Sequence, residues 1–218
     1  MPKILKNQGS YKILAIMVGI NQSSLELIET AGRTAYQSRD KITEGSATKF
    51  AEMLRNRAHE SVFEHSSMTV EFNNVSRGFT HELVRHRIAS FTQESTRYVD
   101  ESDFNVIIPP TRDGDSKIVE LELPNKEKIK VSFNDWVSLN EQMYRGLRKA
   151  DWVTEDARQI LPIGIKSQIV ITANFREWKH IFRLRTGLRA HWEIRRVMTS
   201  LLQEVKEKVP VIFDDIKN

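Results

Sequence analysis

The spacing of its glycines sets the strongest limit on what this chain can fold into. Nine of its 218 residues are glycine, and the closest pair is Gly9 and Gly19. Neither the G-x-G-x-x-G turn of dinucleotide-binding folds nor the glycine-rich loop of P-loop enzymes can form with that spacing. If the protein binds a nucleotide, side chains rather than a glycine-rich backbone must hold its phosphates.

The absence of cysteine excludes a second group of chemistries. Disulfide frameworks, thiolate zinc sites, iron–sulfur clusters and cysteine nucleophiles all require thiols. No apolar run approaches the roughly 18 residues of a membrane span, so we expect a soluble cytoplasmic protein with no membrane partner. Lysine and arginine number 33 against 29 acidic residues, which mildly favours anionic partners but is common in soluble proteins.

Hydrophobic periodicity predicts an α+β protein, with helices and strands mixed in a single compact domain over residues 1–218. Met68, Val70 and Phe72 alternate with polar residues, as in a half-buried strand, and the apolar run 169–173 predicts a buried strand ending at Asn174. Residues 100–115 predict a loop, and residues 117–133 predict a hairpin with charged edges that elaborates the domain. Further strands are expected at 3–5 and 11–17, and helices after Ser23, over 47–57, after Ser76, after Asn134, from Thr154, and over 177–208 with Gly187 as a weak point.

The densest polar cluster runs from His81 to Arg97. Its guanidinium groups and neutral hydrogen-bonding side chains suit a phosphate and a planar polar ring. A solvated helix end explains the same residues equally well, because cations offset the negative end of the helix dipole. The cluster consists of His81, Glu82, Arg85, His86, Arg87, Ser90, Thr92, Gln93, Glu94, Ser95, Thr96 and Arg97.

A second cationic cluster lies near the C-terminus. On one continuous helix, Ile181, Leu184, Leu188 and Trp192 form an apolar stripe with arginines along its margin. Such arginines line a cleft, bind nucleic acid or form a solvated basic face, and their spacing does not separate these interpretations. The arginines are Arg183, Arg185, Arg189, Arg195 and Arg196.

Two other catalytic patterns are disfavoured. His59 and His65 are six residues apart, whereas a helical zinc motif needs histidines four apart, so we expect no metal site. No serine has a glycine two residues away on both sides, so the nucleophile elbow of the α/β-hydrolases is absent.

The spacing of Arg85, His86, Arg87, Ser90, Ser95 and Arg97 reproduces the pattern R-H-R-x-x-S-x-x-x-x-S-x-R. In this pattern the chain resembles the flavin-dependent thymidylate synthases. Further landmarks of that family follow in order, and the resemblance extends from about Ser23 to the C-terminal helix. They are residues 59–61 and 63–65, Ala157-Arg158 before Leu161-Pro162, Asn174-x-Arg176, Leu184-x-Arg185 and Trp192-Glu193.

The resemblance implies an α+β fold like that of the thymidylate synthase-complementing proteins. It implies a methyltransferase that converts dUMP to dTMP without a cysteine nucleophile, with FAD as cofactor. Methylenetetrahydrofolate would donate the carbon, and NADPH would reduce the flavin. The family is usually a homotetramer whose active sites are shared between subunits. The competing interpretation is a basic nucleic-acid-binding protein that uses an arginine-rich helix over residues 183–196.

The resemblance also assigns roles to matching residues. Arg185 is the expected catalytic residue, polarising the uracil ring. The expected cofactor-binding residues are Ser61, Arg85, His86, Arg87, Gln93, Asn174, Phe175, Arg176 and His180. The expected substrate-binding residues are Glu82, Leu83, Val84, Arg85, Gln93, Glu94, Ser95, Thr96, Arg97, Arg158 and Arg185. Three positions depart from the commonest family pattern: Glu82 replaces a glutamine, Glu94 a leucine and Arg189 a histidine, and Glu94 would place a carboxylate beside a dianionic substrate.

Overall fold

The computed structural model describes residues 3–112 and 117–217. Internal contacts divide the chain into two compact units. The first unit contains the described residues of 1–10, 73–82 and 93–168, and the second contains those of 11–72, 83–92 and 169–218. The expectation of a single domain stays a prediction.

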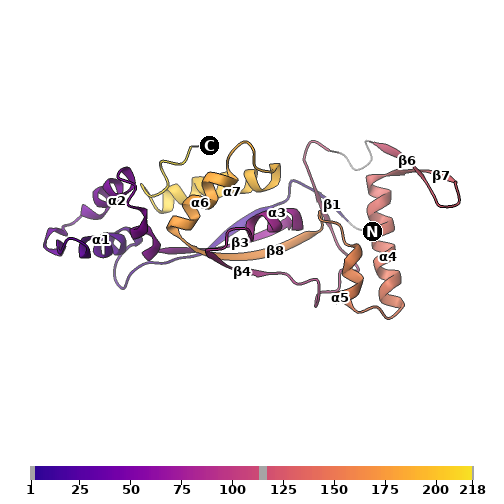
Figure 1. Ribbon diagram of the computed structural model, residues 1–218, viewed down its shortest axis with the longest axis horizontal. Coiled ribbons are helices and arrows are strands. Elements are labelled where there is room, and N and C mark those ends of the chain that lie inside the picture. Colours follow the sequence, from indigo (N-terminus) through magenta and orange to yellow (C-terminus); the bar gives the residue numbers. More distant parts are fainter. Residues whose placement is uncertain (1–2, 113–116, 218) are drawn as a thin grey trace. The chain divides into compact units, whose positions relative to one another are not determined.

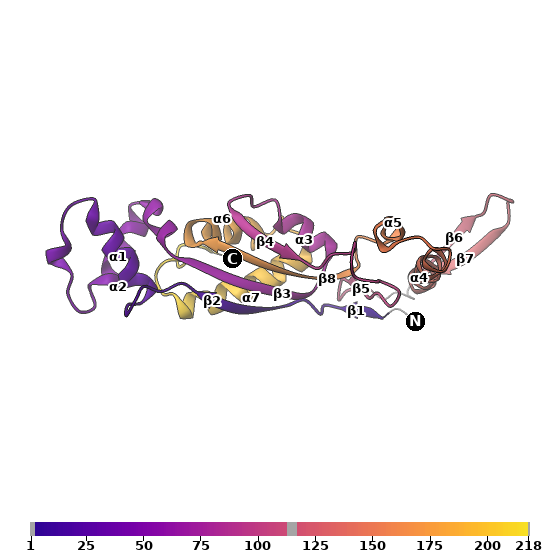
Figure 2. The same cartoon turned by 90° about the horizontal axis from the view of Figure 1, so that it is seen from below.

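The fold is α+β, as predicted (Figures 1 and 2). A four-stranded sheet has the order β2-β3-β8-β4, and the boundary between the units falls within each of these strands. Its strands are β2 (Ser10–Ile16), β3 (Ser67–Ser76), β4 (Ala89–Gln93) and β8 (Lys166–Asn174). No described helix combines the length and apolar character needed to cross a membrane.

The second unit is built around aromatic side chains. Its elements are α1 (Ser24–Thr34), η1 (Arg39–Lys41), α2 (Ser46–Asn56), η2 (Glu60–His65), α6 (Phe175–Arg185) and α7 (Trp192–Lys208). Helices α6 and α7, orange to yellow in Figure 1, lie side by side. Phe213, beyond α7, packs edge-on against Phe175 and Phe182 with ring centroids 5.6 and 5.7 Å away, and all three rings are fully buried. The segment after α7 is therefore part of the core.

The first unit has a smaller core. Strands β1 (Ile4–Lys6) and β5 (Val106–Ile108) pair in parallel, and Phe104, Val137 and Ile165 pack with them. Its helices are α3 (Arg77–Leu83, whose last residue belongs to the second unit), α4 (Phe133–Lys149), α5 (Thr154–Ala157) and η3 (Arg158–Ile160). The predicted hairpin is confirmed as β6 (Ile118–Glu122) and β7 (Lys128–Ser132), with an ion pair of 3.0 Å between Lys128 and Glu120.

Most predicted element boundaries are confirmed. Ser23 caps α1 in a reciprocal capping box with Glu26, and the Ser76 hydroxyl accepts the backbone N–H of Phe79 at 3.0 Å. Strand β3 alternates as expected, since Met68, Val70 and Phe72 are buried.

Three predictions about individual elements are wrong. The predicted loop 100–115 contains β5, because its short apolar run pairs with β1 across the sequence; residues 113–115 lie outside the described residues. Ser132 rather than Asn134 caps α4, since its side chain accepts the N–H of Asp135. The helix expected over 183–196 is broken between Arg185 and Trp192, around the weak helix former Gly187.

Phe213 tests whether the segment after α7 belongs to the core. Phe213→Ala should lower the free energy of unfolding by about 3–5 kcal/mol, because it removes a fully buried ring and leaves a cavity. Urea unfolding followed by far-ultraviolet circular dichroism measures the change. Ile20→Ala, at a side chain that is 93 % exposed, is the control and should cost little. Equal stability of the two variants would contradict the packing described.

Candidate active site

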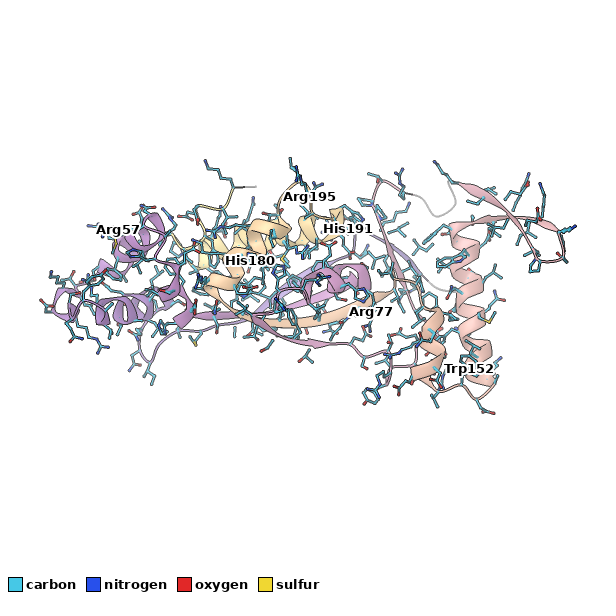
Figure 3. All side chains as sticks on the ribbon, viewed as in Figure 1. Arg57, Arg77, Trp152, His180, His191 and Arg195 are labelled. Atoms are coloured by element: carbon cyan, nitrogen blue, oxygen red, sulfur yellow. The ribbon has the colours of Figure 1, made fainter. Side chains whose placement is uncertain are left out.

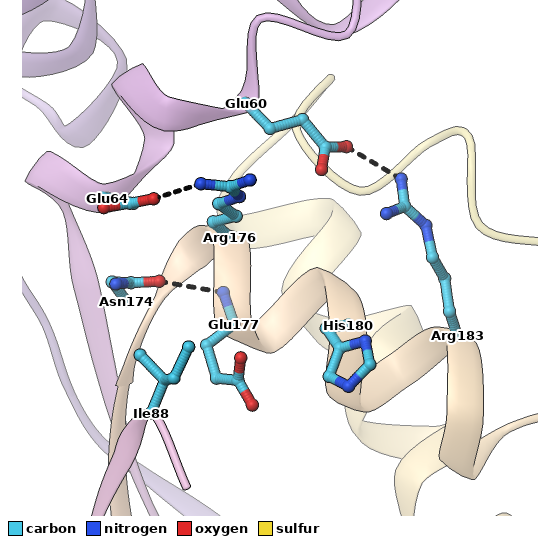
Figure 4. A pocket seen from close by; sticks show the side chains of 8 residues that line it. All are labelled: Glu60, Glu64, Ile88, Asn174, Arg176, Glu177, His180 and Arg183. Atoms are coloured by element: carbon cyan, nitrogen blue, oxygen red, sulfur yellow. Dashed lines mark hydrogen bonds and ion pairs between the residues drawn. The ribbon is translucent and has the colours of Figure 1, made fainter. Parts of the chain in front are cut away.

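Helix α6 lines a cavity in the second unit with polar side chains. Asn174 ends β8 and caps the helix, its Oδ1 accepting the backbone N–H of Glu177 at 2.8 Å. Arg176, His180 and Arg183 then follow at helical spacing on one side of α6. The cavity has a volume of about 500 Å³ (Figure 4). It is lined by Glu60, Glu64, Ile88, Asn174, Arg176, Glu177, His180 and Arg183.

Carboxylates of η2 hold the arginines of this cavity. Arg176 Nη1 donates to Glu64 at 2.5 Å, and Arg183 Nη2 donates to Glu60 at 2.8 Å (Figure 4). The fully buried Lys179 also contacts Glu60, at 3.0 Å. Although burial opposes the change, hydrogen bonds from Arg183 and Lys179 lower the pKa of Glu60, so this carboxylate stays ionised.

His86 of the R-H-R signature meets Arg185 in the second unit. Arg185 Nε donates to His86 Nε2 at 3.0 Å, and His86 Nδ1 lies 3.4 Å from a carboxylate oxygen of Glu177. Burial lowers the pKa of His86 to about 4, and the charges of Arg185 and His180 act in the same direction. The imidazole is therefore neutral near pH 7 and accepts a hydrogen bond from the guanidinium.

Two histidines and a carboxylate meet here. Ligand atoms of His86, Glu177 and His180 lie within 4.8 Å of one another. Arg185 already occupies His86 Nε2 and places a fixed positive charge beside the group, which opposes a divalent cation. Hydrogen bonding explains the arrangement without an ion, and the expectation of no metal site stays a prediction.

The first unit forms a separate cationic cavity of about 360 Å³. Its polar lining consists of Arg77, His81, Thr96, Arg158 and Gln159. Burial lowers the pKa of Arg77 and the charge of Arg158 adds to this, while Glu101 and Glu94 oppose it. Two guanidinium groups that repel each other across one cavity suit an anion with more than one charge.

The segment from Gln93 to Arg97 is held by specific hydrogen bonds within the first unit. Gln93 Nε2 donates to Thr80 Oγ1 at 2.8 Å, and Arg77 Nη2 donates to the Glu94 carbonyl at 2.7 Å. Ser95 Oγ accepts the backbone N–H of Arg97 at 3.3 Å, and the Arg97 guanidinium lies 3.0 Å from Glu155.

The side chain of Glu94 does not line the cationic cavity. Its Oε2 is buried and has no hydrogen-bond partner among the described residues. Burial raises the pKa of Glu101 to about 7, and the charge of Glu94 adds to this rise. The charge of Glu94 acts on Glu101 and Arg77, and its side chain is not part of the cavity lining.

Some predicted site residues lie elsewhere in their units. The side chains of Leu83 and Phe175 are buried in the core, so these residues can contact a ligand only through their backbone atoms. Ser61, Val84, Arg85 and Arg87 are exposed and do not line the cavity of α6, and Glu82 is half-buried on α3. Sequence reasoning missed Arg77, Glu101 and Glu177, which carry no motif; their polar contacts join segments distant in the sequence.

Three of the five arginines in the C-terminal cluster form hydrogen bonds with other residues of the chain. Arg183 binds Glu60 and Asp215, Arg185 binds His86, and Arg195 Nη1 donates to the Leu188 carbonyl at 3.0 Å near His191 (Figure 3). Arg196 is half-buried, and burial lowers its pKa. Leu184 and Leu188, expected in a core stripe, are 51 % and 87 % exposed; α6 ends at Arg185, so Leu188 lies beyond the helix.

The sequence matches one protein family over most of its length. The model of the thymidylate synthase complementing proteins covers residues 17–211. A flavin-dependent thymidylate synthase of Corynebacterium efficiens is 35 % identical over 198 residues, which are 88 % of this chain and 79 % of that protein. Its counterpart in Clostridium tetani is 38 % identical over 177 residues, covering 79 % and 71 % of the two chains.

Two solved structures share the fold. Thymidylate synthase X of Helicobacter pylori, determined with FAD and dUMP, has a TM-score of 0.68 at 21 % identity and covers 95 % of this chain and 98 % of its own. The UMP/dUMP methylase PolB of Streptomyces cacaoi, bound with 5-Br dUMP, has a TM-score of 0.74 at 22 % identity over 97 % and 95 % of the two chains. The architecture thus has the α+β fold of these two proteins. The chain belongs to the thymidylate synthase complementing protein family.

Glu101 makes the stability of the protein depend on pH. Its pKa is about 7 when folded against 4.5 for an ordinary glutamate, so the folded state binds a proton that the unfolded chain has released. The free energy of unfolding should therefore fall by about 1–3 kcal/mol between pH 4.5 and 7 from this group alone. Glu101→Gln should remove this decrease and exceed the wild type in stability at pH 8.

Urea unfolding at several pH values compares the two proteins. Glu122→Gln, on the exposed hairpin, is the control and should keep the wild-type dependence. If Glu101→Gln also keeps that dependence, Glu101 is ionised in the folded protein and the pKa assignment is wrong.

Proposed function

We propose that this protein is a flavin-dependent thymidylate synthase, which transfers a one-carbon unit to dUMP and reduces it to the methyl group of dTMP. The observation that carries the proposal is the contact between His86 of the R-H-R signature and Arg185 at the end of α6. In this contact the expected catalytic guanidinium donates to the histidine of the signature. His86 also adjoins the α6 cavity, because its ring lies 5.4 Å from that of His180, which lines the cavity.

The residues of the α6 cavity fit FAD by their chemistry. Arg176 and Arg183 offer cationic donors for a pyrophosphate, and Asn174 and His180 offer neutral donors and acceptors for the polar edge of a ring. Arg85 and Arg87, exposed on either side of His86, add two further guanidinium groups. When bound, FAD supplies the hydride that no side chain can provide.

Arg185 polarises the substrate in this proposal. A fixed guanidinium beside the uracil imide stabilises the ionised ring, which makes the adjacent carbon electron-rich enough to react without a covalent bond to the enzyme. His86 Nε2 accepts the Nε–H of Arg185 and so orients the guanidinium. Because His86 is neutral, it adds no second charge that would compete with Arg185.

The cavity of the first unit suits the phosphate of dUMP. Arg158 lines it, and Arg158 Nε donates to the Glu155 carbonyl at 3.1 Å, which fixes one edge of the guanidinium. Thr96 contributes a hydroxyl to the same lining. The roles of Ser95 and Arg97 follow from their positions in the signature, and those of Gln93, Glu82, Leu83 and Val84 from the family resemblance.

The remaining parts of the proposal rest on family membership. They are NADPH as reductant, methylenetetrahydrofolate as carbon donor, a homotetramer with shared active sites, and a cytoplasmic location. The alternative of a nucleic-acid-binding helix over 183–196 has no support, because α6 ends at Arg185 and three of the five arginines hold internal partners.

The flavin provides the first test. The purified protein should be yellow, or should become so when FAD is added, and its visible absorbance should bleach when NADPH is added without oxygen. With dUMP and methylenetetrahydrofolate present, dTMP should form and can be measured by chromatography. A colourless protein that takes up no FAD would falsify the proposal.

Arg185→Lys tests the polarising role. Lysine retains the charge but loses the planar, two-point grip of the guanidinium, so flavin binding should persist while dTMP formation falls by about 10- to 100-fold. Steady-state kinetics and the visible spectrum measure the two properties. Arg189→Lys, at a nearby exposed position, is the matched control and should leave both unchanged. Full turnover in Arg185→Lys would remove Arg185 from the chemistry.

A further inference from the structure

The proposed mechanism gives no role to one buried carboxylate in the lining of the α6 cavity. Glu177 lies in the first turn of α6 and is 8 % exposed. Its backbone N–H is already capped by Asn174, so helix capping does not require its side chain. Burial raises its pKa, which marks an environment that is costly for a negative charge. A carboxylate kept in such a place calls for a specific partner.

The hydrogen bond from Arg185 shows which nitrogen of His86 carries the proton. A guanidinium Nε–H only donates, so His86 Nε2 must be the unprotonated acceptor at 3.0 Å. The buried imidazole is neutral, since its pKa is about 4. Its one proton therefore lies on Nδ1, the nitrogen that faces Glu177 at 3.4 Å.

A carboxylate at this place selects that tautomer. An ionised carboxylate accepts hydrogen bonds and donates none, so it stabilises an Nδ1–H and disfavours a bare Nδ1. Selecting the tautomer of an imidazole through the nitrogen remote from its working partner is a general use of buried carboxylates. The chain Glu177, His86, Arg185 has this order, and all three residues lie in the second unit.

We propose that Glu177 is a positioning residue, which fixes His86 in the Nδ1–H form so that His86 Nε2 can hold the guanidinium of Arg185 in place. The inference rests on the proposed function for its catalytic consequence, but the tautomer itself does not depend on any activity. Burial raises the pKa of Glu177, and the interaction with His180, the other titratable group that faces it, acts in the opposite direction.

The first experiment measures the tautomer directly in the flavin-loaded protein. In protein labelled with ¹⁵N-histidine, His86 should show a protonated Nδ1 and an unprotonated Nε2, with the signal assigned by its loss in His86→Gln. In Glu177→Met, which cannot accept a hydrogen bond, the Nε2–H form should appear. An unchanged Nδ1–H form in Glu177→Met overturns the proposal, even if the protein proves to have another activity.

Kinetics then test whether Glu177 acts through His86. Glu177→Met should lower kcat for dTMP formation by about 10- to 100-fold, while flavin content and the KM for dUMP change little. Glu177→Gln should recover much of the rate, because its amide oxygen can still accept from Nδ1–H. In a His86→Gln background, Glu177→Met should cause no further loss. Additive losses, or equal losses in Glu177→Met and Glu177→Gln, would show a merely structural role.

A matched variant separates this role from general destabilisation. Glu29 is also a buried carboxylate of the second unit, 1 % exposed and 2.7 Å from Arg33, but it lies on α1. Glu29→Met should lower the melting temperature, yet leave the His86 signals and kcat unchanged. If Glu29→Met reproduces the effects of Glu177→Met, loss of folding stability explains both and the proposal fails.

Discussion

Recognition of anions by side chains is the constraint on which the rest of this structure depends. A glycine-rich loop binds phosphates with backbone N–H groups that are fixed by the fold, whereas an arginine side chain loses considerable freedom when it is held. The structure meets this constraint by giving its arginines partners. Glu64 holds Arg176, Glu60 holds Arg183, and His86 holds Arg185. Guanidinium groups ordered before binding lose less entropy when a ligand arrives.

The partners differ in charge, and this difference has a consequence for each arginine. Arg176 and Arg183 are paired with carboxylates, so part of their charge is neutralised before any ligand binds. Arg185 donates to a neutral imidazole, which neutralises none of its charge. A group that must stabilise charge developing on a substrate benefits from the second arrangement, because a neutral partner does not compete with the substrate for the cation.

The sequence predicts the fold where its signals are local. The Ser23 capping box and the alternation of β3 depend on neighbouring residues and are confirmed. Strand β5 is not visible in the sequence, because three apolar residues become a strand only by pairing with β1, about a hundred residues earlier. The exposure of Leu188 follows from the end of α6, which a continuous helical pattern hides. Long-range pairing and helix termination therefore account for the errors.

In the candidate site, too, local sequence signals predict some residues, and only long-range contacts reveal the others. The signature places His86 and Arg185 in the site, yet neither the signature nor local spacing names Glu177, which reaches His86 across the fold. Glu94 is the opposite case, because its position in the sequence suggested that its carboxylate would repel a dianionic substrate. Its side chain does not line the cationic cavity; burial raises the pKa of Glu101, and the charge of Glu94 adds to this rise. Arg77 lines that cavity, and burial lowers its pKa together with the charge of Arg158; the charges of Glu101 and Glu94 oppose this and so help to keep two cations facing one anion site.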